Sequence, residues 1–128
     1  MSRFKTLRVW NNAVAVDLKI LEELNKLNSP NYFELKNQIR RASISISSNI
    51  AEGSGRYSDK DFIRFLRISL ASSMEVESQL FLLKNSMILD GLPLDVDSIL
   101  KDLTEIQKQL RSLVNYLNGK CKNDFKPK

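Results

Sequence analysis

Histidine is absent from this 128-residue chain. Its absence removes the commonest general base, the commonest zinc ligand and every Ser–His or Cys–His pair used in nucleophilic catalysis. Glycine-rich phosphate loops, CxxC pairs and HExxH helices are missing as well. The sequence therefore predicts a protein that is not an enzyme, with no catalytic residues, no metal site and no cofactor.

Cysteine, glycine, proline and long apolar runs are also scarce. The single cysteine, Cys121, cannot form an intramolecular disulfide, so a reducing cytoplasm is the simplest compartment. No apolar run approaches the roughly 20 residues that span a bilayer, and the basic N-terminus has no apolar core behind it. We therefore expect neither a membrane partner nor a signal peptide. Only four glycines and three prolines occur, mostly at expected helix ends, which favours an all-α domain.

Apolar residues recur at three- and four-residue spacing in four long segments, as amphipathic helices require. Four such helices joined by short connections predict an antiparallel, up-down-up-down four-helix bundle. The bundle domain is predicted to cover residues 1–118, followed by a basic, flexible tail at 119–128. The predicted helices cover residues 7–27, 32–54, 59–89 and 95–117.

The same spacing predicts which side chains form the core. On the first helix the inner face is predicted to carry Trp10, Val14, Leu18 and Leu21, among others. On the third helix Phe81 and Ile88 are predicted to widen the main apolar stripe. Residues 43–47 alternate with period two, which would also suit a strand, but helical spacing continues on both sides of them. The helix is therefore preferred there.

The chain has a formal net charge of +5, and its basic residues are concentrated in its first half. Residues 1–67 carry 12 Lys/Arg against 7 Asp/Glu, whereas residues 68–128 carry 8 of each. Such an excess favours a phosphate-bearing partner, RNA or DNA. A solvated face without a function would have the same composition, and several arginines are expected to pair with carboxylates. The candidate nucleic-acid-binding residues are Arg8, Arg40, Arg41, Arg56, Arg64 and Arg67.

The outer side of the second helix suggests a second interface. Ile44 and Ala51, with Ser47 beside them, lie roughly 120–140° from the centre of the predicted core face. An isoleucine beside a surface of small residues is expected to be covered by another subunit. Ile44, Ser47 and Ala51 are therefore candidate oligomer-interface residues.

Several polar side chains are candidates for a structural network within the bundle. Asp17 falls within the apolar stripe of the first helix, where it is either a helix-edge carboxylate in water or a partly buried partner of an arginine. Glu77 is either at the bundle edge or paired with a cation, because a buried unpaired carboxylate is costly. The full set of network candidates is Asp17, Asn49, Glu52, Glu75 and Glu77.

Residues 38–80, QIRRASISISSNIAEGSGRYSDKDFIRFLRISLASSMEVESQL, closely resemble a known family. The segment is similar to the QIRRA-x-SI-x-NIAEG-x-GR, FLxIA and GS-x-x-ELE motifs of the 23S rRNA intervening-sequence proteins, a family of four-helix bundles. That family includes the accessory variability determinant of diversity-generating retroelements. The likeness covers roughly residues 4–90, with Ser47 where many members have proline, Ala71 for a glycine and Val76 for a leucine.

The resemblance implies a small bundle that assembles into a ring, often a pentamer, with a basic surface or channel. Retroelement members bind nucleic acid and a reverse transcriptase, and no catalytic residues carry over. We therefore expect a non-enzymatic homo-oligomer that binds RNA or DNA. The alternative is an adaptor or scaffold for a protein such as a reverse transcriptase, with no direct nucleic-acid role.

Overall fold

A computed structural model describes residue 4, residues 7–92 and residues 94–124, with side chains up to residue 120. Its helices lie close to those predicted, and a short 3-10 turn that was not predicted precedes the second helix. No strand occurs in the part of the chain that the structure describes. The elements are α1 (Arg8–Asn25), η2 (Pro30–Tyr32), α2 (Phe33–Ser54), α3 (Asp59–Leu89) and α4 (Asp97–Asp124).

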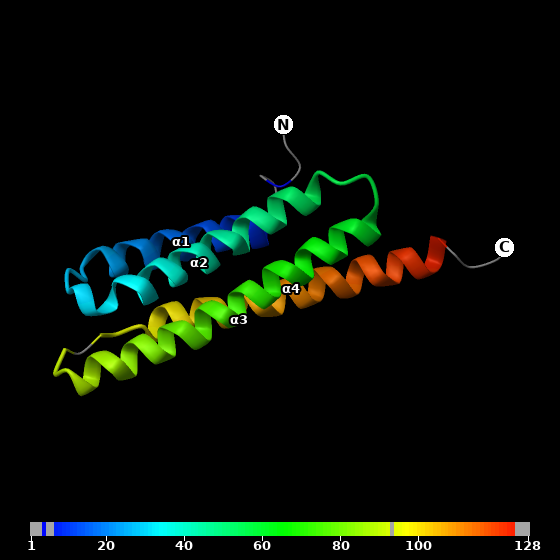
Figure 1. Ribbon diagram of the computed structural model, residues 1–128. Helices are drawn as coiled ribbons and strands as arrows, with labels where there is room; N and C mark the ends of the chain where they lie inside the picture. Colours follow the sequence, from blue (N-terminus) through cyan, green and yellow to red (C-terminus); the bar gives the residue numbers. More distant parts are fainter. Residues whose placement is uncertain (1–3, 5–6, 93, 125–128) are drawn as a thin grey trace.

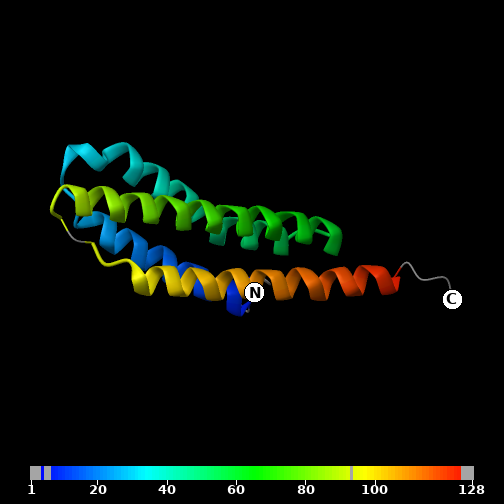
Figure 2. The same cartoon turned by 90° about the horizontal axis from the view of Figure 1, so that it is seen from below.

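The four α-helices form an all-α bundle in which consecutive helices run in opposite directions (Figure 1). α1 packs against α2 and α4, and α3 packs against the same two helices. α1 has 18 residues whereas α4 has 28. The second half of α4 therefore extends beyond α1, as Figure 2 shows. At that end of the bundle the helices are α2, α3 and α4 alone.

One apolar core runs through the bundle, and glycine lets two helices approach closely within it. A Cβ placed on Gly53 of α2 would lie 2.6 Å from the Cβ of Phe65 and 3.0 Å from Cδ1 of Phe62, both on α3. Only glycine fits at that crossing without a shift of the neighbours. The largest fully buried side chains are Ile20, Leu24, Ile39, Ile46, Ile50, Phe62, Leu66, Leu80, Leu83, Leu103, Ile106 and Leu110.

Residues next to α3 in the chain mark both of its ends. The Ser58 hydroxyl accepts a hydrogen bond of 3.1 Å from the Asp61 amide, as an N-cap should. Gly91 follows α3 with φ of 75°, a backbone conformation that favours glycine. At the C-terminal end of α3, the Tyr32 hydroxyl donates a hydrogen bond to the carboxylate of Asp90, which ties the start of α2 to the end of α3.

The predicted end of the fourth helix is wrong. α4 begins at Asp97 and continues to Asp124, past the expected stop at Leu117. Residues 119–124, assigned to the tail, are thus helical, while residues 125–128 lie outside the described residues. Gly119 alone does not end the helix, and the ammonium of Lys120 lies 3.3 Å from the carboxylate of Asp59 on α3.

Two predictions about the core are also wrong. Leu18 is exposed and Val14 and Leu21 are only partly buried, because α1 turns Val9, Val16 and Ile20 inward. Trp10 is partly buried and packs against the core, as predicted. Phe81 and Ile88 of α3 lie on the surface. Both helices carry apolar residues over more than one face, so the spacing shows amphipathicity without showing which apolar side is covered. Over the described residues, none of the helices is both long and apolar enough to cross a bilayer.

Candidate functional site

Asp17 lies in the seam between α1 and α2, where its carboxylate is bound by two serines. Ser43 Oγ donates to Asp17 Oδ1 over 2.6 Å, and Ser47 Oγ donates to Oδ2 over 2.7 Å. Burial raises the pKa of Asp17 to about 6, and the two hydrogen bonds oppose this rise. Both sequence alternatives for Asp17 are therefore wrong: the carboxylate is buried, and its partners are hydroxyl groups instead of an arginine.

The same hydrogen bond changes the interpretation of Ser47. Its hydroxyl, expected at an oligomer interface, is directed at α1. The sequence also gave no role to Ser43, whose alternation with isoleucines resembled a strand pattern. The signal that could have identified the pair is their spacing of four, which places both hydroxyls on one side of α2 facing Asp17.

Asn49 lies in a second polar seam, between α2 and α3. Its amide donates to the backbone oxygen of Ser45 over 2.8 Å and to the hydroxyl of Ser45 over 2.9 Å. That hydroxyl lies 2.8 Å from the hydroxyl of Ser72. The Ser69 hydroxyl donates to the carbonyl of Ile46 over 2.7 Å. Small hydroxyl residues thus allow the two helices to pack closely while their polar groups stay bonded.

The three glutamates of the predicted network lie nearer to solvent. Glu52 accepts from Arg56 over 3.0 Å, four residues along the chain. Glu75 is exposed and accepts from Gln79 over 3.3 Å. Glu77 is partly exposed and, within the described residues, pairs with no cation. The ammonium of Lys84, on the same helix, lies 3.2 Å from the carboxylate of Asp97.

Two of the candidate arginines converge on one aromatic ring near the α2–α3 turn. The guanidinium of Arg56 lies 4.6 Å from the ring centre of Phe65, and that of Arg64 lies 5.1 Å from it. Phe65 itself is buried. Stacking on the ring restricts both guanidinium groups, and acidic neighbours partly neutralise them. The neighbours are Glu52 for Arg56 and, at 3.9 Å, Asp61 for Arg64.

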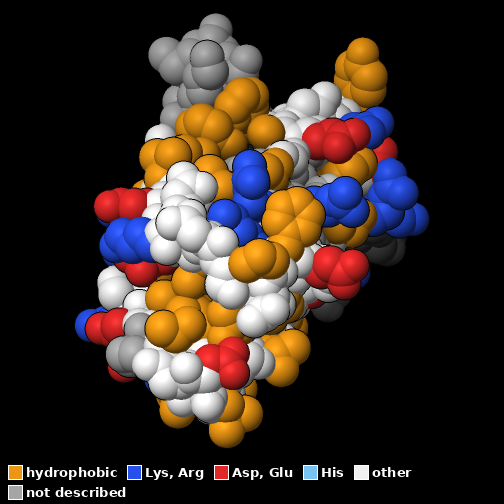
Figure 3. All heavy atoms as spheres, turned by 60° about the vertical axis from the view of Figure 1, so that its left-hand side comes forward, with side chains coloured by type: hydrophobic (Ala, Val, Ile, Leu, Met, Phe, Trp, Pro, Cys, Tyr) orange, Lys and Arg blue, Asp and Glu red, His pale blue; other side chains and the backbone are white. Residues whose placement is uncertain are grey.

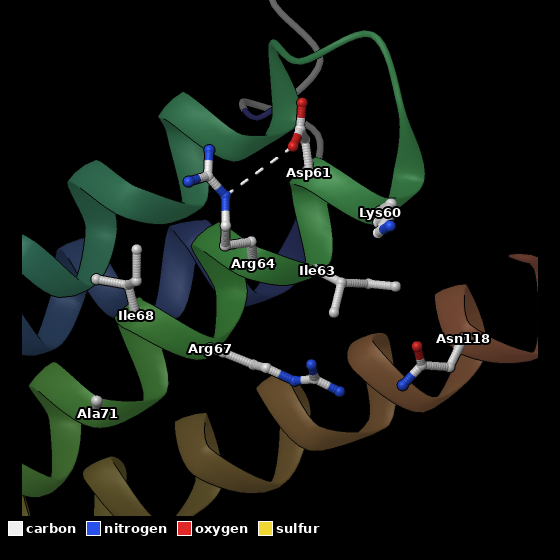
Figure 4. Close-up of a pocket in the computed structure, with 8 residues that line it drawn as sticks. All are labelled: Lys60, Asp61, Ile63, Arg64, Arg67, Ile68, Ala71 and Asn118. Carbon is white, nitrogen blue, oxygen red and sulfur yellow. Dashed lines mark ion pairs between the residues drawn. The ribbon is translucent and has the colours of Figure 1, made fainter.

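An open groove of about 750 Å³ lies on the N-terminal half of α3, close to this cluster. Its apolar side chains are Ile63, Ile68 and Ala71, and its cations are Lys60, Arg64 and Arg67. Figure 4 shows Arg64 turned toward Asp61 and Arg67 extended toward Asn118 on α4. The two guanidinium groups therefore point to different sides of α3. We call this surface, lined by the residues labelled in Figure 4, the α3 groove.

The remaining candidate arginines lie elsewhere on the bundle. Arg8, Arg40 and Arg41 are exposed and form no ion pair within the described part of the chain, and the same holds for Lys60 and Arg67. Arg41 lines a separate hollow of about 420 Å³ with Ser72 and Glu75. The six arginines thus do not form one cluster. On the face in Figure 3, lysine and arginine side chains lie beside hydrophobic ones.

A row of exposed apolar side chains follows the C-terminal half of α3. Met74, Phe81 and Ile88 repeat every seven residues, which places them on one side of the helix. Leu82 and Leu89 lie beside them, and Leu89 is 87% exposed. The polar residues between them, Ser78 and Asn85, carry no charge. We call Met74, Phe81, Leu82, Ile88 and Leu89 the α3 stripe.

The α3 stripe is larger than the assembly surface expected from the sequence. Ile44 is exposed and Ala51 is partly buried, so the α2 face presents one large apolar side chain where α3 presents five. The sequence contains the signal, a seven-residue repeat of apolar residues, but two of its members, Phe81 and Ile88, are predicted to lie in the core. Hydrophobic side chains also reach the surface at the end of the bundle that faces the viewer in Figure 3.

The described residues contain no group of three His, Cys, Asp or Glu side chains placed to hold a metal ion. The arrangement instead combines exposed cations, an apolar groove and an apolar stripe, which are features of binding surfaces. In comparisons with known proteins, the model of the family described as 23S rRNA-intervening sequence protein matches residues 5–112. The match covers α1, α2 and α3 entirely and more than half of α4. No curated protein matches the sequence.

Proposed function

The chain belongs to the 23S rRNA-intervening sequence protein family, and we propose that it is a non-enzymatic, self-associating four-helix bundle that binds nucleic acid. The observation that carries this proposal is a set of exposed cations without an acidic partner among the described residues. Most of them lie in the first half of the chain, where basic residues outnumber acidic ones, while Lys101 and Arg111 of α4 are also exposed and unpaired. Those in the first half are Arg8, Arg40, Arg41, Lys60 and Arg67.

Unpaired surface cations bind phosphates at low cost because no internal ion pair has to be broken first. Each phosphate contact releases condensed counterions, so affinity falls as salt rises. Arg56 differs from Arg67 in this respect, since it must leave Glu52 before it can bind a phosphate with full charge. We therefore assign phosphate binding first to the unpaired cations, and to Arg56 and Arg64 second.

Self-association is proposed through the α3 stripe. Contiguous exposed apolar surface on a soluble bundle marks an interaction site more often than chance exposure does. A ring of five subunits is the assembly implied by the sequence resemblance, and a ring would bring the unpaired cations of several copies to one nucleic acid. Light scattering on the purified protein tests assembly, and a strict monomer at micromolar concentration would contradict it.

The α3 stripe also supports a second function, that of an adaptor for another protein. In that case the stripe is covered by a partner, such as a reverse transcriptase, and the protein itself contacts no nucleic acid. A binding experiment distinguishes nucleic-acid binding from the adaptor function. Mobility-shift titrations against structured RNA and duplex DNA, at about 50 mM and about 200 mM salt, should show binding that weakens strongly with salt. Absence of binding at the lower salt, or binding that salt does not change, favours the adaptor.

A further inference from the structure

We infer that the α3 groove, together with Tyr57, binds single-stranded nucleic acid in preference to a duplex. This inference rests on the proposed function, and it adds the form of the nucleic acid and the place where it binds. A base stacks on Tyr57, and the strand crosses α3 with phosphates near Arg64 and Arg67.

Tyr57 is the first observation that favours a single strand. It lies in the α2–α3 turn, between Arg56 and the N-cap Ser58, and its relative exposure of 109% leaves the whole side chain in water. An isolated exposed aromatic residue needs no explanation, but this one directly follows Arg56, whose guanidinium lies over the Phe65 ring together with that of Arg64. An aromatic ring beside fixed cations is the combination that proteins use to stack the bases of single strands.

The shape and charge of the α3 groove are the second observation. Ile63, Ile68 and Ala71 give it an apolar floor, while Arg64 and Arg67 point to different sides of α3 (Figure 4). A strand that crosses the helix therefore meets a cation on each side and an apolar surface between them. Single strands present both phosphates and apolar base faces. Duplexes hide their base faces, so they could use the cations but not the floor or Tyr57.

An acidic peptide is the other occupant that the charges would accept. It would pair with Arg67 and Lys60, which have no carboxylate partner within the described residues. It offers no flat π-face for Tyr57, however, whereas every nucleotide of a single strand offers one. The exposed aromatic ring therefore favours the strand.

Fluorescence anisotropy with a labelled 12-nucleotide uridine strand, and with a labelled duplex of the same length, tests the inference on the full chain. Tyr57→Ala is expected to weaken strand binding by roughly 5- to 100-fold, the loss of one base–aromatic stack. Duplex binding should change by less than about twofold, since it lacks that stack. Tyr57→Phe should retain the affinity of the natural protein. Tyr116→Ala, which removes another exposed tyrosine on α4, is the matched control and should have no effect.

The outcomes separate this inference from the proposed function. Equal affinity of Tyr57→Ala and Tyr116→Ala for the strand would overturn the inference while leaving nucleic-acid binding intact. No binding of either probe by the natural protein would overturn both. Displacement of the strand by poly-glutamate as efficiently as by unlabelled RNA would identify an acidic peptide as the occupant. A change of oligomeric state in Tyr57→Ala would identify a second copy of the chain as the occupant, and either result overturns the inference.

Discussion

The hydroxyl of Ser43 donates a hydrogen bond of 2.6 Å to the buried carboxylate of Asp17. Ser47 binds the second carboxylate oxygen, and within the described residues no cation compensates the charge. Two neutral donors offset only part of the cost of burying a carboxylate. The seam between α1 and α2 therefore holds a negative charge at neutral pH at the expense of stability.

This arrangement predicts that the contribution of Asp17 to the free energy of unfolding is larger in mild acid than at neutral pH. The pKa of Asp17 is raised from 3.8 to about 6 in the folded state, so the folded protein binds more protons than the unfolded chain between those values. Stability must then fall as pH rises from about 4 to about 6, by roughly 3 kcal/mol in total. Urea unfolding at a series of pH values measures this change in the free energy of unfolding.

Asp17→Asn removes the charge and keeps groups that can bond to both serines. We expect it to be more stable than the natural protein above pH 6.5, by roughly 1–3 kcal/mol, and to lose the pH dependence between 4 and 6. Asp102→Asn is the control, because this partly exposed carboxylate pairs with Lys19 on the surface. An Asp17→Asn variant whose stability follows the same pH curve as the natural protein would contradict the assignment.

Gly53 and Gly119 are predicted to respond to alanine in opposite directions. At Gly53 the added Cβ meets Phe65 at 2.6 Å, so Gly53→Ala should destabilise the fold by roughly 1–3 kcal/mol. At Gly119 nothing lies within 4 Å, and alanine favours the helix there by up to about 1 kcal/mol. Thermal unfolding by circular dichroism measures both. Stabilisation by Gly53→Ala would show that α2 and α3 are not in close contact at this point.

The two candidate assembly surfaces can be distinguished by placing a charge on each. Phe81→Glu on the α3 stripe is expected to weaken self-association by roughly 30-fold or more, the effect of losing a central apolar contact. Ile44→Glu on α2 is the matched variant and should leave assembly nearly unchanged. Both side chains are exposed, so the helical content of either variant should match that of the natural protein.

Light scattering with sedimentation over a range of concentrations provides the measurement. Dissociation by Ile44→Glu but not by Phe81→Glu would restore the α2 face predicted from the sequence. If neither substitution changed the assembly, both surfaces would be excluded.

The sequence was sufficient for the fold because local signals agree with one another over long segments. The apolar spacing, the breaks at Pro30 and Gly91 and the Ser58 cap locate the four helices within a few residues, apart from the end of α4. The family motifs support the same architecture, and the family match now extends into α4. Local signals do not locate the C-terminal end of α4, where Gly119 stands inside the helix and Lys120 pairs with Asp59, a residue far away in the chain.

The candidate site was harder to predict because it depends on which side of each helix is covered. Leu18 and Phe81 fit an apolar stripe as well as Ile20 and Leu80 do, but only packing against neighbouring helices decides which are buried. The partners of Asp17 were missed for the same reason. The sequence does not distinguish Arg56, which pairs with Glu52, from Arg67, which has no acidic partner within the described residues. Only the contacts in the folded chain show which arginines are unpaired.

The most direct test of the account is a salt titration of nucleic-acid affinity by fluorescence anisotropy. The natural protein is compared with the triple variant Arg41→Gln, Lys60→Gln, Arg67→Gln, which removes unpaired cations. Its control is Lys19→Gln, Lys84→Gln, Lys108→Gln, which removes three lysines that already have acidic partners. We predict that log affinity falls linearly with log salt, and that the first variant reduces the slope by roughly 2–3 while the control leaves it nearly unchanged. Salt-independent binding, or an equal effect of both variants, would contradict the account.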